Sequence, residues 1–266
     1  MLLAIDVGNT NIVLGVLDGE KLVDGWRLAT VRERTADELG IWTCQLFEHA
    51  RIETAAITDI VMASVVPPLS GTIVEMAKRY FGLTPFVIDG DTDTGMPNLY
   101  GTPSEVGADR LVNGVAAFER YGRAAGKAVI VVDFGTATTF DAISARGEYL
   151  GGVICPGVQI SADALFQRAS KLPRVDIQRP TQVIGRSTVG SMQSGLFYGY
   201  IGLVEGIVRR MRSELGGQAL CVATGGLSEL IAPETPAIEA VDRDLTLHGL
   251  RMIWERNRGQ VPKTGA

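Results

Sequence analysis

The sequence predicts an α/β fold made of two similar domains, each with a mixed sheet, that face each other across a cleft. The chain has 266 residues, enough for two modest domains, and its 46% hydrophobic and 21% charged residues suit ordinary packed cores. The stronger observation is an internal repeat. One apolar run ends in Ile5-Asp6-Val7-Gly8-Asn9-Thr10, and a second ends in Val132-Asp133-Phe134-Gly135-Thr136-Ala137. Each opens a three-strand meander that is followed by helices.

The first half of the chain begins with the first meander. Asp18-Gly19 is a strong hairpin signal between two apolar runs. Thr35 and Glu38 fit a capping box at the start of a helix. The loop from Asp89 to Pro103 is rich in Gly, Pro, Asp and Thr. The predicted strands are Leu2–Ile5, Ile12–Leu17, Leu22–Ala29, Ile60–Val66 and Phe86–Ile88, and the predicted helices are Thr35–Ala50, Leu69–Phe81 and Gly107–Tyr121.

The second half repeats this order of elements. Its predicted strands are Ala128–Val132, Thr138–Ile143, Tyr149–Ile154 and Ala219–Ala223, and its helices are Gly157–Ala169, Ser187–Leu215 and Asp244–Asn257. Two strand-to-turn junctions can match by chance, but the shared order of elements favours duplication. We expect the boundary near Gly122–Lys127, which gives domains 1–122 and 123–266, with the last helix able to pack back on the first domain.

Composition narrows the class of function. The net charge is −5 with a pI of about 5.2 and no basic run, so nucleic acid is not an expected partner. The apolar N-terminal run reaches the charged Asp6 too early for a signal peptide, and no segment is long enough to span a membrane. The polar tail from Arg256 to Ala266 is expected to fray. An anionic ligand must therefore be held by backbone N–H groups, helix N-termini, a few arginines or bound cations.

The cysteines and histidines suggest no catalytic or metal site. Cys44, Cys155 and Cys221 lie too far apart for a zinc knuckle or a disulfide framework, so we expect three buried thiols in a reducing cytoplasm. His49 and His248 are isolated, and they are more typical of a helix surface or of packing than of a general base.

The first Asp-x-Gly-Asn-Thr motif predicts a phosphate site. Gly8 permits a tight turn and close approach to a ligand, and the backbone N–H groups around Asn9 can line a phosphate. Asp6 supplies a carboxylate for Mg²⁺. The alternative is a hairpin turn whose side chains bond their own backbone. Repetition of the motif favours the functional interpretation.

The second copy and a third junction support this interpretation. Asp133 suits a cation, and the hydroxyls of Thr136, Thr138 and Thr139 suit a phosphate chain, although the threonines also fit simple strand propensity. Gly225-Gly226 follows an apolar strand, where adenine or ribose can lie against the backbone. Gly-Gly alone is weak evidence.

A pair of charges opens the helix after the long loop. Asp109 can accept a hydroxyl proton, and Arg110 can neutralise a phosphoryl group or a carboxylate. A helix-start acid beside a solvated arginine explains the pair equally well. The segment Gly122–Lys127 looks like a P-loop but is one residue short and precedes a strand, so Lys127 is interpreted as a solvated linker residue.

Together these motifs resemble type III pantothenate kinases, of the superfamily of acetate and sugar kinases, Hsp70 and actin. The resemblance runs along nearly the whole chain and implies two ribonuclease H-like, actin-like domains. The matching segments are Asp6–Asn11, Ser64–Pro67, Tyr100-Gly101, Gly107–Arg110, Asp133–Thr139, Gly152–Gly157 and Thr224–Gly226.

The resemblance also implies an activity and its cofactors. Family members phosphorylate pantothenate with ATP to 4'-phosphopantothenate, the first step of coenzyme A biosynthesis. The implied cofactors are ATP, Mg²⁺ and a monovalent cation, K⁺ or NH₄⁺. The implied assembly is a cytoplasmic homodimer with the substrate pocket at the subunit interface.

Residue roles follow from the same resemblance. Asp109 is the implied catalytic base, with Arg110 beside it, Asp133 holds the monovalent cation and Asp6 lies near Mg²⁺. The expected ATP contacts are Asp6, Val7, Gly8, Asn9, Thr10, Asn11, Ile12, Val13, Thr136 and Gly225. The expected pantothenate contacts are Tyr100, Gly107, Ala108, Asp109, Arg110 and Thr188.

Two alternatives stay open, and one structural expectation is added. The chain can be another small-molecule kinase of the superfamily, or a nucleotide-dependent regulator without catalysis, although intact Asp6, Asp109, Arg110 and Asp133 argue for catalysis. The run Leu196–Ile201 is apolar on more than one face, which predicts a dimer interface that includes the helix after Ser187. Burial of this helix within its own domain is the alternative.

Overall fold

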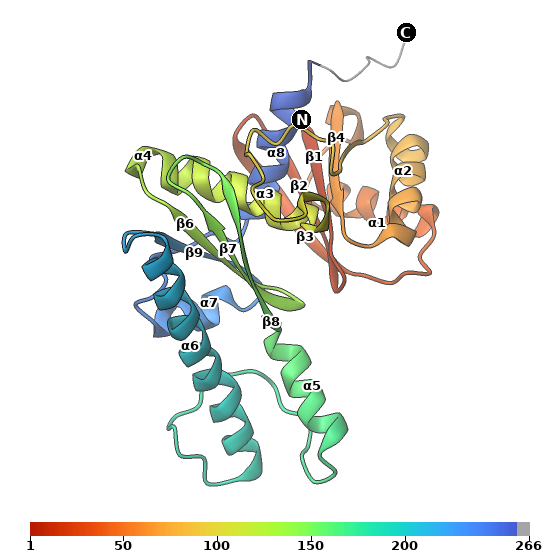
Figure 1. Ribbon diagram of the computed structural model, residues 1–266. Coiled ribbons are helices and arrows are strands. Elements are labelled where there is room, and N and C mark those ends of the chain that lie inside the picture. Colours follow the sequence, from red (N-terminus) through yellow and green to blue (C-terminus); the bar gives the residue numbers. More distant parts are fainter. Residues whose placement is uncertain (260–266) are drawn as a thin grey trace. The chain divides into compact units, whose positions relative to one another are not determined.

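The computed structural model describes residues 1–259, and the expected fraying of residues 260–266 lies outside the described residues. The chain folds as two compact units (Figure 1). Unit 1 contains Met1–Met96, Gly101–Ala116 and the segment from Thr246 onward. Unit 2 contains Pro97–Tyr100 and Ala117–Leu245.

Unit 1 is built on a five-stranded mixed sheet with the order β3-β2-β1-β4-β5. Its central strand β1 is buried along most of its length, as expected of an apolar strand covered on both faces. The hairpin forms at Asp18-Gly19, where Gly19 takes a left-handed φ of 57°. The strands are β1 (Leu2–Val7), β2 (Asn11–Asp18), β3 (Lys21–Ala29), β4 (Asp59–Ser64) and β5 (Phe86–Ile88).

The helices of unit 1 are α1 (Ala36–His49), α2 (Pro67–Phe81), α3 (Ala108–Ala117) and α8 (Leu245–Asn257). The predicted capping box is confirmed, because Thr35 and Glu38 each accept a backbone hydrogen bond from the other. Helix α2 begins at Pro67, two residues before the predicted start, since proline at a first helical position loses no hydrogen bond. Helix α8 packs closely on α3: a Cβ at Gly249 would lie 2.2 Å from the carbonyl oxygen of Val112.

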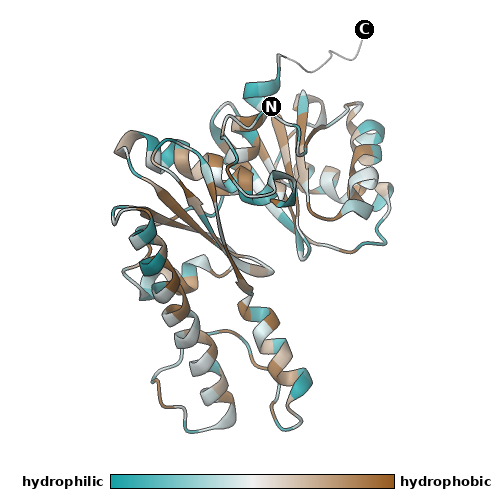
Figure 2. Cartoon of the chain, viewed as in Figure 1, coloured by the Kyte–Doolittle hydropathy of each residue, from teal (hydrophilic) through white to brown (hydrophobic). Residues whose placement is uncertain are grey.

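Unit 2 repeats the topology of unit 1. Its sheet has the order β10-β9-β6-β7-β8, with an antiparallel meander on one side of the first strand and parallel strands on the other. The strands are β6 (Val129–Phe134), β7 (Ala137–Ile143), β8 (Tyr149–Pro156), β9 (Leu220–Gly225) and β10 (Ala240–Val241). The predicted duplicated α/β fold is confirmed. In Figure 2 the hydrophobic colour follows the central strands β1 and β6, which are buried along most of their length.

The helices of unit 2 are α4 (Arg123–Ala125), α5 (Val158–Arg168), α6 (Thr188–Glu214) and α7 (Ser228–Ile231). The run Leu196–Ile201 of α6 contributes four buried side chains, Leu196, Phe197, Tyr200 and Ile201, to the core of unit 2. The apolar side chains that suggested a dimer interface are therefore largely buried within unit 2. The apolar character of this run thus no longer supports an interface.

Several local expectations need correction. The predicted linker residues 122–125 are helical: a π-helical turn at Phe118–Gly122 leads into α4, which ends at the left-handed Gly126. Lys127 is half-buried between α4 and β6. Arg256 and Asn257, where fraying was expected to begin, still belong to α8 and contact Asp93. The short elements β10 and α7 were not predicted.

The cysteines differ from one another in burial. All three are free thiols, but only Cys221 is buried, and that burial raises its pKa to about 12. Cys44 and Cys155 are half-buried, so the expectation of three core thiols was wrong for them. His49 is exposed at the end of α1, and His248 is buried in α8. Within residues 1–259, no helix combines the length and the apolar character needed to cross a membrane.

Candidate functional site

The first predicted motif forms the tight turn between β1 and β2. The Gly8 N–H donates to the Asn11 carbonyl at 2.9 Å and closes the turn. A Cβ at Gly8 would lie 3.1 Å from that same carbonyl oxygen, so glycine suits the position. Asn9 and Thr10 are exposed at the tip. Both residues are therefore open to solvent, and a ligand-binding role for their backbone stays a prediction.

Thr30 holds this turn and was not singled out from the sequence. Its hydroxyl donates to the Gly8 carbonyl at 2.7 Å, and its N–H donates to the Thr10 carbonyl at 2.9 Å. The hairpin turn alone would pair Asn11 with Leu28. A register shift between Val16 and Leu17 pairs Asn11 with Ala29 instead, and the next residue, Thr30, then reaches the turn.

Asp6 lies on the central strand of the same sheet. It is half-buried and pairs with Val13 of β2 and Ala63 of β4. A carboxylate beside exposed backbone N–H groups suits a hydrated Mg²⁺ that also binds phosphate oxygens. Within residues 1–259 no cluster of three His, Cys, Asp or Glu side chains could enclose a metal ion. A cation here would thus depend on one carboxylate, water and its anionic ligand.

The start of α3 places Asp109 in an enclosed position. Burial raises the pKa of the Asp109 carboxyl, against the opposing effect of the Arg110 backbone N–H, which donates to Oδ1 at 2.8 Å, and of the Arg110 charge. A Cβ at Gly107 would lie 2.6 Å from Oδ1. Arg110 itself is only 9% exposed. The interpretation of Arg110 as a solvated surface residue is therefore wrong.

Asp133 occupies in unit 2 the position that Asp6 occupies in unit 1. It lies on β6 and pairs with Thr224 of β9. Gly225 follows with a left-handed φ of 88°, and a Cβ there would lie 2.5 Å from Asp133 Oδ1 and 2.7 Å from the Phe134 nitrogen. The carboxylate therefore lies directly against the third predicted junction. This arrangement brings two independently predicted motifs together within one unit.

The threonines of the second motif point in different directions. Thr136 is exposed, Thr139 is half-buried and Thr138 is fully buried, because side chains alternate along β7. Thr138 therefore does not join the other two as an accessible hydroxyl. Gly157, just before α5, lies so close to the Thr136 carbonyl that a Cβ would be 2.1 Å from its oxygen. Gly157 thus permits the close approach of the start of α5 to this turn.

Tyr100 and Thr188 lie on separate elements of unit 2. Tyr100 is half-buried, and its N–H donates to the Asn98 side chain at 3.1 Å. Thr188 is exposed at the first position of α6, next to the capping residue Ser187, whose hydroxyl accepts from the Gly190 N–H at 3.1 Å.

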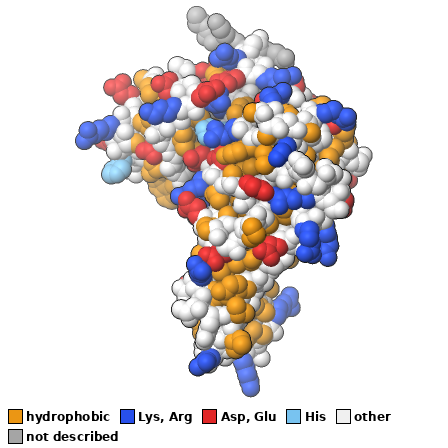
Figure 3. Space-filling view, turned by 90° about the vertical axis from the view of Figure 1, so that its left-hand side faces the viewer, with side chains coloured by type: hydrophobic (Ala, Val, Ile, Leu, Met, Phe, Trp, Pro, Cys, Tyr) orange, Lys and Arg blue, Asp and Glu red, His pale blue; other side chains and the backbone are white. Residues whose placement is uncertain are grey.

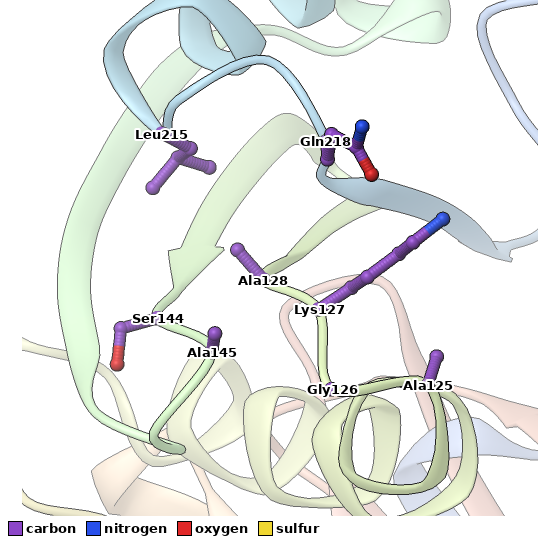
Figure 4. A pocket seen from close by; sticks show the side chains of 8 residues that line it. All are labelled: Ala125, Gly126, Lys127, Ala128, Ser144, Ala145, Leu215 and Gln218. Carbon is purple, nitrogen blue, oxygen red and sulfur yellow. The ribbon is translucent and has the colours of Figure 1, made fainter.

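A hollow elsewhere in unit 2 contains none of the predicted site residues (Figure 4). Its volume is about 470 Å³. Figure 4 shows the Lys127 side chain extending from the start of β6 toward the side where Gln218 lies. The hollow is lined by Ala125, Gly126, Lys127, Ala128, Ser144, Ala145, Leu215 and Gln218.

Sequence comparison identifies close relatives. The family model of type III pantothenate kinases matches residues 2–210. A type III pantothenate kinase of Myxococcus xanthus is 59% identical over 257 residues, covering 97% of this chain and 99% of that protein. The type III pantothenate kinases of Geobacter sulfurreducens and Moorella thermoacetica are 55% and 56% identical, and each match covers 97% of this chain and 100% of the relative.

Solved structures share the fold at low sequence identity. A Campylobacter jejuni protein described as a Baf family transcriptional activator matches with a TM-score of 0.59 and 18% identity, covering 97% of this chain and 99% of that one. Acetate kinase of Entamoeba histolytica matches with a TM-score of 0.52 and 11% identity, covering 97% and 99%. These similarities confirm the predicted actin-like fold.

The contact between Gly225 and Asp133 predicts an unequal response to alanine substitution. Gly225→Ala and Gly216→Ala both place a Cβ on a left-handed residue, at φ of 88° and 82°, which costs roughly 1–2 kcal/mol. Gly216 has open space around it, whereas Gly225 abuts Asp133 and the Phe134 backbone. Urea unfolding should therefore show a larger loss of stability for Gly225→Ala, and equal losses would contradict the described contact.

Proposed function

The chain belongs to the type III pantothenate kinase family, and we propose that it transfers the terminal phosphoryl group of ATP to pantothenate, giving 4'-phosphopantothenate. This is the first step of coenzyme A biosynthesis. The observation that carries the proposal is the match at 59% identity over 97% of this chain, together with the intact motifs Asp6–Asn11, Gly107–Arg110 and Asp133–Thr139. A coupled ATPase assay with and without pantothenate tests it.

The turn between β1 and β2 is proposed to bind the ATP phosphates. Phosphoryl transfer asks the protein mainly for positioning and charge neutralisation. The exposed backbone around Asn9 and Thr10, held by Thr30, supplies N–H donors, and Asp6 would hold a hydrated Mg²⁺ that neutralises phosphate charge. The proposed ATP contacts extend through Asp6–Val13 and include Thr136 and Gly225.

Asp109 is proposed as the general base toward the pantothenate hydroxyl. A base works best when its pKa lies near the working pH, and burial moves the pKa of Asp109 upward, in that direction. Arg110, nearly buried beside it, would neutralise charge on the transferring phosphoryl group or on the substrate carboxylate. Tyr100, Gly107, Ala108 and Thr188 are the other proposed pantothenate contacts.

Asp133 is proposed to hold a monovalent cation, K⁺ or NH₄⁺. Glycine at position 225 lets the Asp133 carboxylate and the Phe134 backbone lie within 2.7 Å of where a Cβ would be, so the carboxylate is held beside backbone atoms. Oxygen donors of this kind suit a hard cation. A second cation would also help an acidic chain of net charge −5 to hold a polyanion.

A homodimer and a cytoplasmic location complete the proposal. Exposed apolar side chains gather on β8, on α5 and before α6, with Ile154 63% exposed and Ile184 80% exposed. Figure 3 shows such side chains over the helical part of unit 2. Large exposed apolar patches mark interaction surfaces. The three free thiols suit a reducing cytoplasm.

For the cation, we expect pantothenate-dependent ADP formation to be slow in Na⁺ buffer and to be restored by K⁺ or NH₄⁺. Asp133→Asn should abolish this response, because the amide carries no charge to hold the ion. Rates that are equal in Na⁺ and K⁺ buffer would refute the cation site while leaving the kinase activity itself intact.

For the base, Asp109→Asn should lower kcat by about 10²-fold, the low end of the usual 10²–10⁴ range, because a loose transition state needs little proton removal. The Kd for ATP, measured by calorimetry, should change by no more than about twofold. Such a change lies below the ~0.5 kcal/mol expected of substitutions without direct contact. Near-normal kcat with only a raised pantothenate KM would instead make Asp109 a binding residue.

The same variant should be no less stable than the wild type at neutral pH. A carboxyl whose pKa is raised in the folded state stabilises the fold below its unfolded pKa of about 3.9, and that stabilisation is lost as the pH rises through the raised value. The asparagine amide does not ionise, so the variant does not lose stability in this way as the pH rises. Asp18→Asn, in the exposed hairpin turn, is the matched control for losing a carboxylate.

For assembly, light scattering at micromolar concentration should give twice the monomer mass. Ile184→Glu should shift the protein toward monomer, because a charge would be buried in the interface. Val23→Glu, at an exposed apolar position of β3, should leave the mass unchanged. A wild-type monomer would contradict the proposal.

A further inference from the structure

A four-residue segment of the long loop is attached to the edge of the unit 2 sheet. Strand β8 is an edge strand, so one row of its backbone groups is available for pairing. Asn98 forms a parallel bridge with Tyr149. The Tyr149 N–H donates to the Pro97 carbonyl at 2.9 Å, and the Leu99 N–H donates to the Tyr149 carbonyl at 2.8 Å. Both backbone groups of one residue, Tyr149, thus hold this segment.

The ring of Tyr100 rests on the same strand. Its centroid lies 6.4 Å from that of Tyr149, with the rings inclined at 54°, within the usual range for an aromatic pair. A Cβ at Gly151 would lie 3.3 Å from the Tyr100 ring. Tyr149 therefore fixes both the backbone that leads to Tyr100 and one side of its ring.

The side chain of Tyr149 is itself held by buried polar groups. Tyr149 is 0% exposed, and its hydroxyl donates to Asp141 Oδ1 at 2.7 Å. Asp141 is 1% exposed, and its Oδ2 accepts from the Thr139 hydroxyl at 3.2 Å. Burying a carboxyl is costly unless it is hydrogen-bonded, and both hydroxyls help to offset that cost. A phenylalanine would have filled the same space without that requirement.

An irregularity in the sheet places Tyr149 on the correct face. Asp141 pairs with Gly152 and Ala142 with Gly151, but Ile143 pairs with Tyr149, so Leu150 is an extra residue in β8. Gly151 takes a φ of 129° at this point. A one-residue shift moves a side chain to the opposite face of a sheet. The bulge therefore brings the Tyr149 hydroxyl to the face that carries Asp141 and Thr139.

We propose that Tyr149 and Asp141 are positioning residues that fix Tyr100 for pantothenate binding. This inference rests on the proposed function, in which Tyr100 contacts pantothenate. The hydroxyl-to-carboxyl bond orients the Tyr149 ring, and Tyr149 in turn orders residues 97–100 through two backbone bonds and a ring contact. An ordered contact residue lowers the entropic cost of binding, so the pair acts on pantothenate affinity.

The test is Tyr149→Phe, which removes the hydroxyl and keeps the ring. The pantothenate KM should rise about tenfold, which corresponds to ~1.4 kcal/mol and lies near the lower bound for a hydrogen bond to a charged group. The KM for ATP should stay within about twofold, since the nucleotide contacts are not altered. Tyr80→Phe is the matched control: Tyr80 donates to Asp37 at 2.8 Å in unit 1, and its loss should change neither KM.

Conservative rescue separates positioning from general stability. In Asp141→Asn the amide oxygen can still accept from the Tyr149 hydroxyl, so its pantothenate KM should lie closer to wild type than that of Tyr149→Phe. If Tyr149→Phe does not fold, the double variant Tyr149→Phe/Asp141→Asn carries the same test, because it leaves no buried charge facing the position of the missing hydroxyl. A folded variant that loses kcat while both KM values stay normal would overturn the inference.

Tyr100→Ala distinguishes failure of this inference from failure of the proposed function. A raised pantothenate KM in Tyr100→Ala, with no change in Tyr149→Phe, would overturn the positioning role and leave the assignment of Tyr100 standing. An unchanged pantothenate KM in Tyr100→Ala would remove Tyr100 from the substrate site, and with it the basis of the inference. Parallel increases in both variants support it.

Discussion

The absence of a side chain at a few glycines is the constraint on which the candidate site residues depend. Asp109 Oδ1 lies where a Cβ at Gly107 would be 2.6 Å away, and Asp133 Oδ1 lies where a Cβ at Gly225 would be 2.5 Å away. Neither carboxylate could keep its position beside any other residue type. The two glycines differ in a second respect, because only Gly225 has a left-handed φ. At Gly107 the requirement is space alone, which explains why a helix start can supply it without backbone strain.

The regular elements and the repeated motif were predictable because they depend on local signals. The Thr35 cap and the hairpin at Gly19 each follow from residues close in sequence. The positions of individual side chains were less predictable. Thr138 points into the core although its neighbours do not, and the apolar run Leu196–Ile201 is largely buried in its own unit. The bulge at Leu150 places the Tyr149 side chain on the opposite face of the sheet from the one that regular pairing would give. The alternation of polar and apolar residues in the sequence does not reveal this bulge.

An acidic chain without a P-loop lysine must neutralise a polyanion by other means. The turn between β1 and β2 offers exposed backbone, held in shape by Thr30 from the neighbouring strand. The two repeated aspartates, Asp6 and Asp133, would repel phosphate by themselves. A cation bound to each carboxylate turns this repulsion into attraction. On the proposed function, duplication of the fold thus supplies two carboxylates for two ions of different charge. Arg110, nearly buried, adds a fixed positive charge next to the proposed base.

Asp141 and Asp109 illustrate how similar groups take different roles. Both oxygens of Asp141 accept hydrogen bonds, from Tyr149 and from Thr139, so neither is available to take a proton from a substrate. Asp109 instead accepts hydrogen bonds from backbone N–H groups, that of Arg110, which reaches Oδ1, and its own. A carboxylate has lone pairs beyond these two contacts, so it keeps the capacity to accept a substrate hydroxyl. Burial then raises the pKa of Asp109 without a hydroxyl network to stabilise the charge. Proton acceptance suits Asp109, and the satisfied bonds of Asp141 suit the fixing of Tyr149.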